Sequence, residues 1–195
     1  MSEQRIFVLA EHALADVIDQ IRDDQWAQRK PEWFQTGGQG PASLRDIVNY
    51  HAYDSAWVPD VLAGNTIPEV GDVYEYLKSD SNVNYRLFSE KAAAAATALD
   101  DPGKIVHLSY GDFPAREYLK HVTSFRGFRA YDIAKWIGVS AQLPDELVQG
   151  MWDEFAPDVE QWRALGVYGS AVAVPDDAPL QDRLLGLVGR DPAGY

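Results

Sequence analysis

The sequence predicts an all-α protein built as a bundle of long helices with long connections. Apolar residues recur at three- and four-residue steps in several long segments, which is the spacing of amphipathic helices. Glycine and proline, which end or begin helices, fall between those segments. The chain has 195 residues and no clear linker, so a single domain over residues 1–195 is expected.

The first helix is predicted from about Glu3 to Trp26. The segment KPEWFQTGGQGPAS then breaks the periodicity and indicates a connection. Its GGQGPAS part is similar to a phosphate loop, but no strand precedes it, so a nucleotide site is not predicted. The apolar stripe of the helix consists of Ile6, Leu9, Ala10, Ala13, Leu14, Val17, Ile18 and Ile21.

The second helix is predicted from about Leu44 to Ala63. Ser43, with Asp46 three positions on, has the form of an N-terminal cap, and Pro59 predicts a late kink or an early end. The next segment, SNVNYRLFSEKAAAAATALDD, contains five consecutive alanines and is predicted to be helical. KIVHLSYGD is short, β-branched and bounded by glycine, which predicts an extended segment near residues 104–110.

The helix after this extended segment is predicted from about Phe113 to Ile137. Pro114 suits its first turn, and Gly138 follows its last. Pro144 is expected to open an additional helix that continues through residue 165. The spacing in LQDRLLGLVG predicts one more short helix near the C-terminus.

Charge and composition limit the classes of function. The net charge is -13 and the pI is about 4.6, so the surface repels nucleic-acid phosphates and anionic lipid headgroups. Neither nucleic acid nor a membrane is therefore an expected partner. There is no apolar run of about 18 residues and no secretory start, which favours a cytoplasmic location. The chain has no cysteine, so any thiol chemistry must come from a cosubstrate.

Two predicted helices carry polar residues on faces that should be buried. In the second helix, Asp54 lies on a stripe of apolar and aromatic residues and must be solvated, paired or functional. His51 lies about 100° around that helix from the neighbouring Tyr50. The other members of the Asp54 stripe are Ile47, Tyr50, Trp57 and Val61.

The helix predicted over residues 113–137 places His121, Phe125 and Arg129 at single-turn intervals. A desolvated arginine is costly unless it is paired, so Asp54 or an anionic ligand is the expected partner of Arg129. Each of the chain's histidines, taken alone, is more typical of a surface or hydrogen-bonded structural residue than of a ligand. These histidines are His12, His51, His107 and His121.

Four segments resemble the DinB-like superfamily, in the branch related to mycothiol-dependent maleylpyruvate isomerase. They follow one another along most of the chain and read IVNYHAYDSAWVPDVLAG, VHLSYGDFPAREYL, AYDIAKWIG and LQDRLLGLVGRDP. The resemblance implies a DinB-like four-helix bundle, here with extra C-terminal helices, and a zinc or nickel ion held between the helices. It also implies a low-molecular-weight thiol cosubstrate, mycothiol. Related bundles often pair, which makes a homodimer a candidate assembly.

The metal-ligand positions of that family carry other residues in this chain. By the resemblance they correspond to Tyr50, Phe125 and Arg129, and His51 is out of register. A divalent ion needs imidazole or carboxylate donors, whereas arginine brings a positive charge and no lone pair. The family metal site is therefore predicted to be lost. A rearranged site made of His51, Asp54 and His121 is the alternative.

The leading hypothesis is a metal-free and cofactor-free protein that binds, or acts on, a small carboxylate or phenolic molecule. Arg129 would hold the anion while Asp54 or a histidine moves a proton, in an isomerisation, a cyclisation or another proton transfer. Two alternatives stay open: a metal- and mycothiol-dependent transferase or isomerase, and a non-catalytic protein with an Asp54–Arg129 core ion pair. The expected catalytic residues are Asp54, His121, Arg129 and Tyr50, and the expected substrate contacts are Trp57, Phe125 and His51.

Overall fold

The computed structural model describes residues 1–34 and 42–194, and 57% of the chain is helical. This confirms the all-α prediction, since the described residues add only one small two-stranded sheet to eight α-helices. None of the helices in these residues is long and apolar enough to cross a membrane. Most of the GGQGPAS segment lies outside the described residues.

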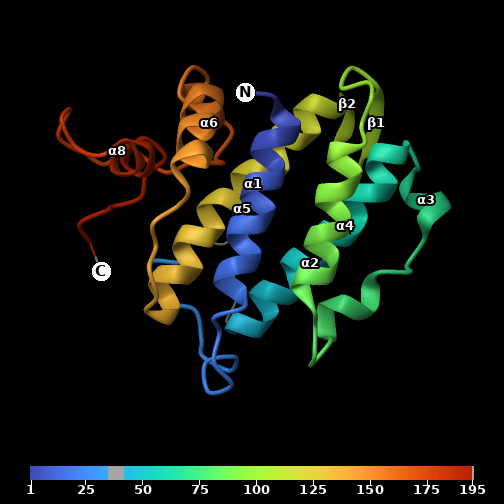
Figure 1. Ribbon diagram of the computed structural model, residues 1–195, viewed down its shortest axis with the longest axis horizontal. Helices are drawn as coiled ribbons and strands as arrows, with labels where there is room; N and C mark the ends of the chain where they lie inside the picture. The colour runs from blue at the N-terminus through green and yellow to red at the C-terminus, as the bar shows by residue number, and fades with distance from the viewer. Residues whose placement is uncertain (35–41, 195) are drawn as a thin grey trace.

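Four long helices lie side by side along the molecule (Figure 1). α1 packs against α4 and α5, and α4 packs in turn against α2. α1 and α5 run in one direction, and α2 and α4 run in the other (Figure 1). α2 and α5 are linked by the long side chain of Arg126 on α5, which reaches Asp54 and Ser55 on α2. The four helices are α1 (Glu3–Ile18), α2 (Leu44–Ala63), α4 (Tyr85–Thr97) and α5 (Ala115–Ile137).

A long return connection follows from these directions. Because α2 and α4 are parallel, the chain must travel back along the bundle between them (Figure 1). It does so through two short elements that the sequence analysis did not predict, α3 (Ile67–Val70) and the 3₁₀ helix η1 (Glu75–Ser79). η1 packs against α2, so the return segment covers one side of that helix.

The ends of α1 and α2 differ in how well they were predicted. α1 stops at Ile18 and not near Trp26, because the chain turns there, with Ile21 donating to the carbonyl of Ile18 at 3.0 Å. Beyond this turn, the side chain of Gln25 donates a hydrogen bond to the carbonyl of Ile137 at 2.9 Å. α2 has the predicted bounds, with a reciprocal capping box between Ser43 and Asp46. Its Pro59 lies inside the helix and does not end it.

The segment predicted as extended is half of a β-hairpin. β1 (Ile105–Leu108) pairs in antiparallel register with β2 (Gly111–Pro114), and Val106 lies opposite Phe113. Phe113 therefore belongs to a strand, and α5 begins two residues later than predicted, at Ala115. The hairpin places its residues beside the first turns of α5, where the cavities described below open.

The C-terminal third adds three helices. The single helix predicted after Pro144 is two helices, α6 (Asp145–Phe155) and α7 (Val159–Ala164). Pro157 lies between them, and proline has no amide hydrogen with which to continue a helix. α8 (Leu180–Leu187) packs against α6. Beyond α8, Arg190 donates from Nε and Nη2 to the two carboxylate oxygens of Asp132 on α5, both at 2.9 Å.

The bundle interior contains a buried ion pair. Glu11 on α1 and Arg126 on α5 have no exposed side-chain surface, and Arg126 Nε donates to Glu11 Oε1 at 3.1 Å. Ser55 on α2 donates to the same oxygen at 2.9 Å, and Tyr85 on α4 donates to Glu11 Oε2 at 2.6 Å. One carboxylate therefore accepts hydrogen bonds from the three other long helices.

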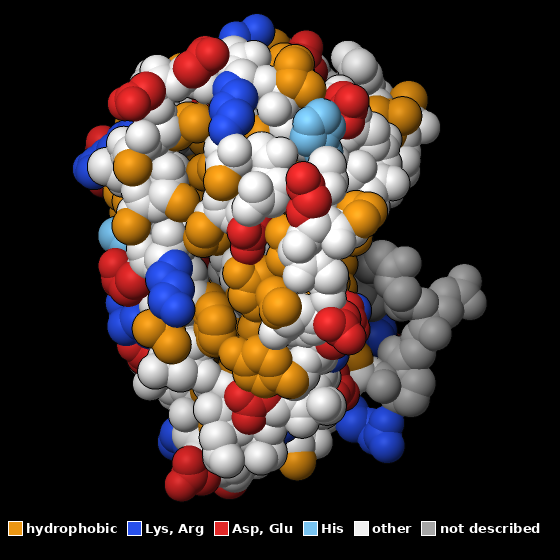
Figure 2. Space-filling view, turned by 90° about the vertical axis from the view of Figure 1, so that its right-hand side faces the viewer, with side chains coloured by type: hydrophobic (Ala, Val, Ile, Leu, Met, Phe, Trp, Pro, Cys, Tyr) orange, Lys and Arg blue, Asp and Glu red, His pale blue; other side chains and the backbone are white. Residues whose placement is uncertain are grey.

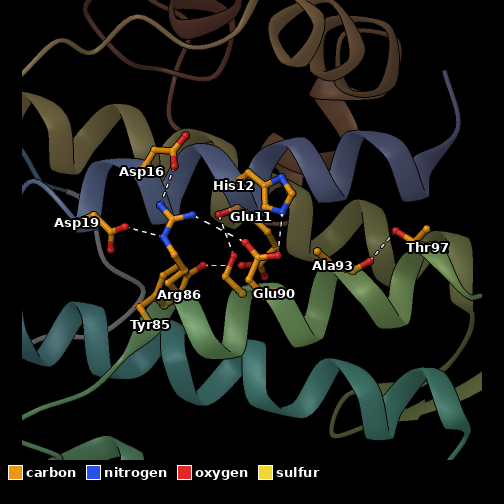
Figure 3. A network of polar contacts seen from close by, with 10 residues as sticks. Glu11, His12, Asp16, Asp19, Tyr85, Arg86, Glu90, Ala93 and Thr97 are labelled. Atoms are coloured by element: carbon orange, nitrogen blue, oxygen red, sulfur yellow. Dashed lines mark hydrogen bonds and ion pairs between the residues drawn. The ribbon is translucent and has the colours of Figure 1, made fainter.

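A second polar network links α1 and α4 nearer the surface (Figure 3). Arg86 on α4 donates to Asp16 at 2.7 Å and to Asp19 at 2.6 Å, and its side chain is 37% exposed. Solvent screens exposed pairs, so they contribute little to stability. The Glu11–Arg126 pair differs, because neither charge can turn to water if its partner is removed.

We expect Glu11→Gln to lower the free energy of unfolding by about 3–5 kcal/mol, because Arg126 would lose the carboxylate that balances its buried charge. Urea unfolding followed by circular dichroism measures the change. The double variant Glu11→Gln/Arg126→Met should recover part of the loss, since it removes both fully buried charges, and Asp54, which loses its contact with Arg126, is 30% exposed. Arg86→Met is the surface control, and an equal loss in that variant would contradict the special role of the buried pair.

Candidate functional site

A cavity of about 410 Å³ lies between α2, α5 and the β-hairpin. Hydrophobic side chains also gather in a hollow on the face of the molecule that carries α3 (Figure 2), and Ile67 of α3 contributes to the cavity. The polar and charged groups in the lining come from Asp54, His107, Ser109, His121 and Arg126. The aromatic groups are Tyr50, Tyr53, Trp57, Tyr110, Tyr118 and Phe125.

The structure places five of the seven predicted site residues around this cavity. Tyr50, Asp54 and Trp57 follow one another at steps of four and three on α2, which turns their side chains to one face. His121 and Phe125 are one turn apart on α5 and face them. Tyr50 and Phe125 are 57% and 53% exposed, so they border the opening and not the floor.

Arg129 does not line the cavity. Its Nη1 lies 3.5 Å from Oδ2 of Asp132, and its guanidinium lies over the ring of Phe34, 4.4 Å from the centroid. The predicted Asp54–Arg129 ion pair is therefore wrong. Arg129 lies one turn beyond Phe125, past the end of the cavity. The arginine that approaches Asp54 is Arg126, whose Nη1 lies 3.8 Å from Asp54 Oδ2.

His51 is also absent from the cavity lining. Its side chain lies in the buried face of α2 with 3% exposure, and its Nδ1 has no hydrogen-bond partner in the described part of the chain. Burial holds the pKa of His51 well below its usual value, and the nearby charges of Arg126 and Arg129 lower it further. The predicted substrate contact is thus replaced by a neutral core histidine.

Asp54 is the carboxylate of the cavity. Burial raises its pKa, while the positive charge of Arg126 opposes that shift and Glu11 adds to it. The side chain of Asp54 keeps 30% exposure, so a molecule in the cavity could reach it. A carboxylate that is easier to protonate than usual is suited to accept and return a proton.

Two hydrogen-bond donors in the cavity lining lack protein acceptors. Nη1 of Arg126 and Nε1 of Trp57 are buried and form no hydrogen bond with any residue in the described ranges. Buried donors are nearly always satisfied in folded proteins, by protein, water or ligand. An oxygen of a bound molecule would supply the missing acceptor.

His121 and Tyr110 form a polar pair at the side of the cavity. The hydroxyl of Tyr110 lies 3.1 Å from Nδ1 of His121, and burial lowers the pKa of the histidine. The imidazole also contacts the rings of Phe113 and Trp162 edge-on, with centroid distances of 5.2 and 5.4 Å. Burial also raises the pKa of Tyr110 to about 12, so its hydroxyl stays protonated and shares a hydrogen bond with the imidazole.

The residues present do not fit the metal centre that the family resemblance implies. Phe125 offers no donor atom, and Arg129 is a cation paired with Asp132. The side chains of His51, Asp54 and His121, the alternative ligand set, do not come together around one point where a metal ion could bind. Within residues 1–34 and 42–194 no group of three or more His, Asp or Glu side chains could hold a metal ion.

Comparisons of this chain with protein-family models, with curated proteins and with solved structures find no match. The residues of the cavity are therefore the basis for assigning a function. Sequence reasoning missed the most important of these, Arg126, together with its partner Glu11. A usable signal was present, because Glu11 is spaced by single turns from the apolar residues Phe7 and Ala15.

We expect the acid sensitivity of the fold to decrease in His51→Leu. An unfolded histidine takes up a proton near pH 6.5, whereas buried His51 takes one up only at lower pH, so stability is lost as the pH falls below about 6.5. Between pH 7.5 and 5.5 the variant should lose about 1 kcal/mol less stability than the parent protein in urea unfolding. His12→Gln, at a side chain that is 41% exposed, is the control. Parallel pH profiles for parent and His51→Leu would contradict this assignment.

Proposed function

We propose that this chain binds a small planar organic molecule with a carboxylate or phenolic oxygen in the α2–α5 cavity, and moves a proton on that molecule. The observation that carries the proposal is the environment of Arg126. Its Nε is fixed by Glu11, while its Nη1 is buried beside Asp54 without a hydrogen-bond acceptor in the described residues. A guanidinium that is held by hydrogen bonds on one edge and has an unpaired N–H group on another can bind an anionic oxygen.

The other walls suit the body of such a ligand. The rings of Tyr53 and Trp57 lie edge to face, 6.2 Å between centroids, and Trp57 and Tyr74 do the same at 5.5 Å. Aromatic walls offer flat apolar surface to a planar ring. A volume of about 410 Å³ is within the range of small-molecule sites.

The charges of the site favour a reaction in which Asp54 changes its protonation state. As a carboxylate, Asp54 can remove a proton from a carbon next to a carbonyl group of the ligand. The electron pair left behind moves onto the carbonyl oxygen, where Arg126 stabilises the enolate. Where the ligand also carries a C=C bond conjugated with this enolate, return of the same proton to the far carbon of that C=C bond shifts the double bond and completes an isomerisation, with all atoms conserved. The His121–Tyr110 pair and Tyr50 at the opening are the candidate partners for proton exchange with solvent.

We also propose that the chain is a divergent member of the DinB-like superfamily. Two of the segments that resemble that family contact each other directly. Asp132 in AYDIAKWIG accepts both hydrogen bonds of Arg190 in LQDRLLGLVGRDP, and Arg190 also lies over the ring of Phe128, 4.7 Å from the centroid. A contact between two separate motifs supports treating them as parts of one fold.

If Arg126 is the anchor, benzoate should bind more tightly than its neutral analogue benzamide. Titration calorimetry with the double variant Glu11→Gln/Arg126→Met, which removes both members of the buried ion pair, should show roughly tenfold or greater loss of benzoate affinity. Arg129→Met is the matched control and should retain the affinity. Loss of benzoate binding in Arg129→Met, with binding retained in the double variant, would show that Arg129 and not Arg126 is the anchor. Equal affinity of the parent protein for benzoate and benzamide would show that the cavity has no anion site.

The catalytic half of the proposal predicts deuterium exchange at carbon. Phenylpyruvate carries a carboxylate for Arg126, a ring for the aromatic walls and acidic C–H bonds for Asp54. Incubation in D₂O should exchange its C3 protons faster with protein than without, and Asp54→Asn should lower the added rate by about 100-fold or more. Proton NMR measures the exchange. A rate unchanged in Asp54→Asn would exclude this aspartate as the base.

A further inference from the structure

A second and larger cavity, of about 550 Å³, lies between α5, α6, α7 and the β-hairpin. It shares Tyr110, His121 and Phe125 with the first cavity, which makes these side chains a common wall. The apolar part of its lining is completed by Phe113, Trp162, Leu165 and Val167. The proton-transfer proposal gives this space no role.

A buried carboxylate lies at the edge of this second cavity. Both side-chain oxygens of Glu154 on α6 are buried, and neither accepts a hydrogen bond from any residue in the described chain. Burial raises the pKa of Glu154 to about 8. An acid without a partner inside a protein destabilises the fold, so it calls for an explanation other than stability.

The charges around Glu154 are mainly negative. A smaller cavity of about 280 Å³ adjoins the second one, and both are lined by Lys120, Glu154 and Asp158. Lys120 lies 3.4 Å from Glu117, which offsets its charge. The acidic side chains that line the two cavities are Glu3, Glu117, Asp153, Glu154 and Asp158, against Lys120 and the chain terminus at Met1.

We propose that this second cavity is a binding site for a small organic cation, namely a protonated amine on an apolar or aromatic body. The ammonium group would donate to the two unpaired oxygens of Glu154, and the rings of Phe113 and Trp162 would surround the apolar body. An anion is disfavoured there by the surrounding carboxylates. The site is separate from the Arg126 anchor, so either proposal can fail without the other.

Binding of an ammonium group requires the ionised form of Glu154. At pH 6 this carboxyl is protonated, so the ligand must displace a proton, whereas near pH 8 half of the molecules are already ionised. Affinity should therefore rise from pH 6 to pH 8. The groups that face Glu154 are Lys120, Glu117 and His121 from α5, Glu3 and the Met1 amino group from the N-terminal segment, and Asp158 before α7.

Titration calorimetry of the full chain with three matched probes tests the site. The amine 2-phenylethylamine should bind at pH 8, whereas the alcohol 2-phenylethanol and the anion 3-phenylpropionate should bind roughly tenfold more weakly or worse. Glu154→Gln should lose about tenfold in amine affinity and should lose the rise with pH. Glu160→Gln removes an equal charge from an 82% exposed side chain of α7 outside the cavity, and should bind the amine as the parent protein does.

Three results would overturn the proposal. The first is equal affinity for amine and alcohol in the parent protein, which does not depend on any variant folding. The second is tighter binding of 3-phenylpropionate than of the amine at this site, observed in Glu11→Gln/Arg126→Met so that the first cavity does not contribute. The third is amine binding that survives Glu154→Gln and disappears in Asp54→Asn, which would place the amine in the first cavity.

Discussion

The buried contact between Glu11 and Arg126 is the constraint on which the rest of the structure depends. A single carboxylate with no exposed surface accepts hydrogen bonds from α2, α4 and α5, so the positions of three helices are fixed relative to α1. This contact also holds the guanidinium of Arg126 between α5 and α2, where it reaches Asp54 and Ser55 on α2. Arg126 and Asp54, the two ends of this bridge, both line the first cavity.

The same pair sets the electrostatics of its neighbours. Arg126 lowers the pKa of His51 and opposes the rise in the pKa of Asp54, although burial is the larger effect on both groups. Burial together with Arg126 keeps His51 neutral inside α2, whereas burial and Glu11 raise the pKa of Asp54 and Arg126 limits that rise. Two residues three positions apart on one helix thus acquire different properties, because one lies in the core and the other borders the cavity.

Local rules predicted the helices well and the charge pairing poorly. The bounds of α2 follow from its capping box and from Gly64, which adopts a φ of 92° after the last turn, and both signals lie within a few residues. The ion-pair partners of Arg126 and Arg129 depend instead on the position of each residue along α5 and on which neighbouring helix it faces, and both are set by tertiary packing. Single-turn spacing selected Arg129, whereas the structure places Arg126 beside Asp54. The pairing of β1 with β2 was missed because the Phe113–Pro114 pair also suits the first turn of a helix.

The sequence distances within the central cluster have a consequence for synthesis of the chain. Glu11 contacts residues that lie 44, 74 and 115 positions later, in Ser55, Tyr85 and Arg126. A nascent chain on the ribosome therefore carries this acid without its counter-charge until Arg126, 115 residues later, has been made. The first three long helices therefore reach their final arrangement only once α5 has emerged from the ribosome.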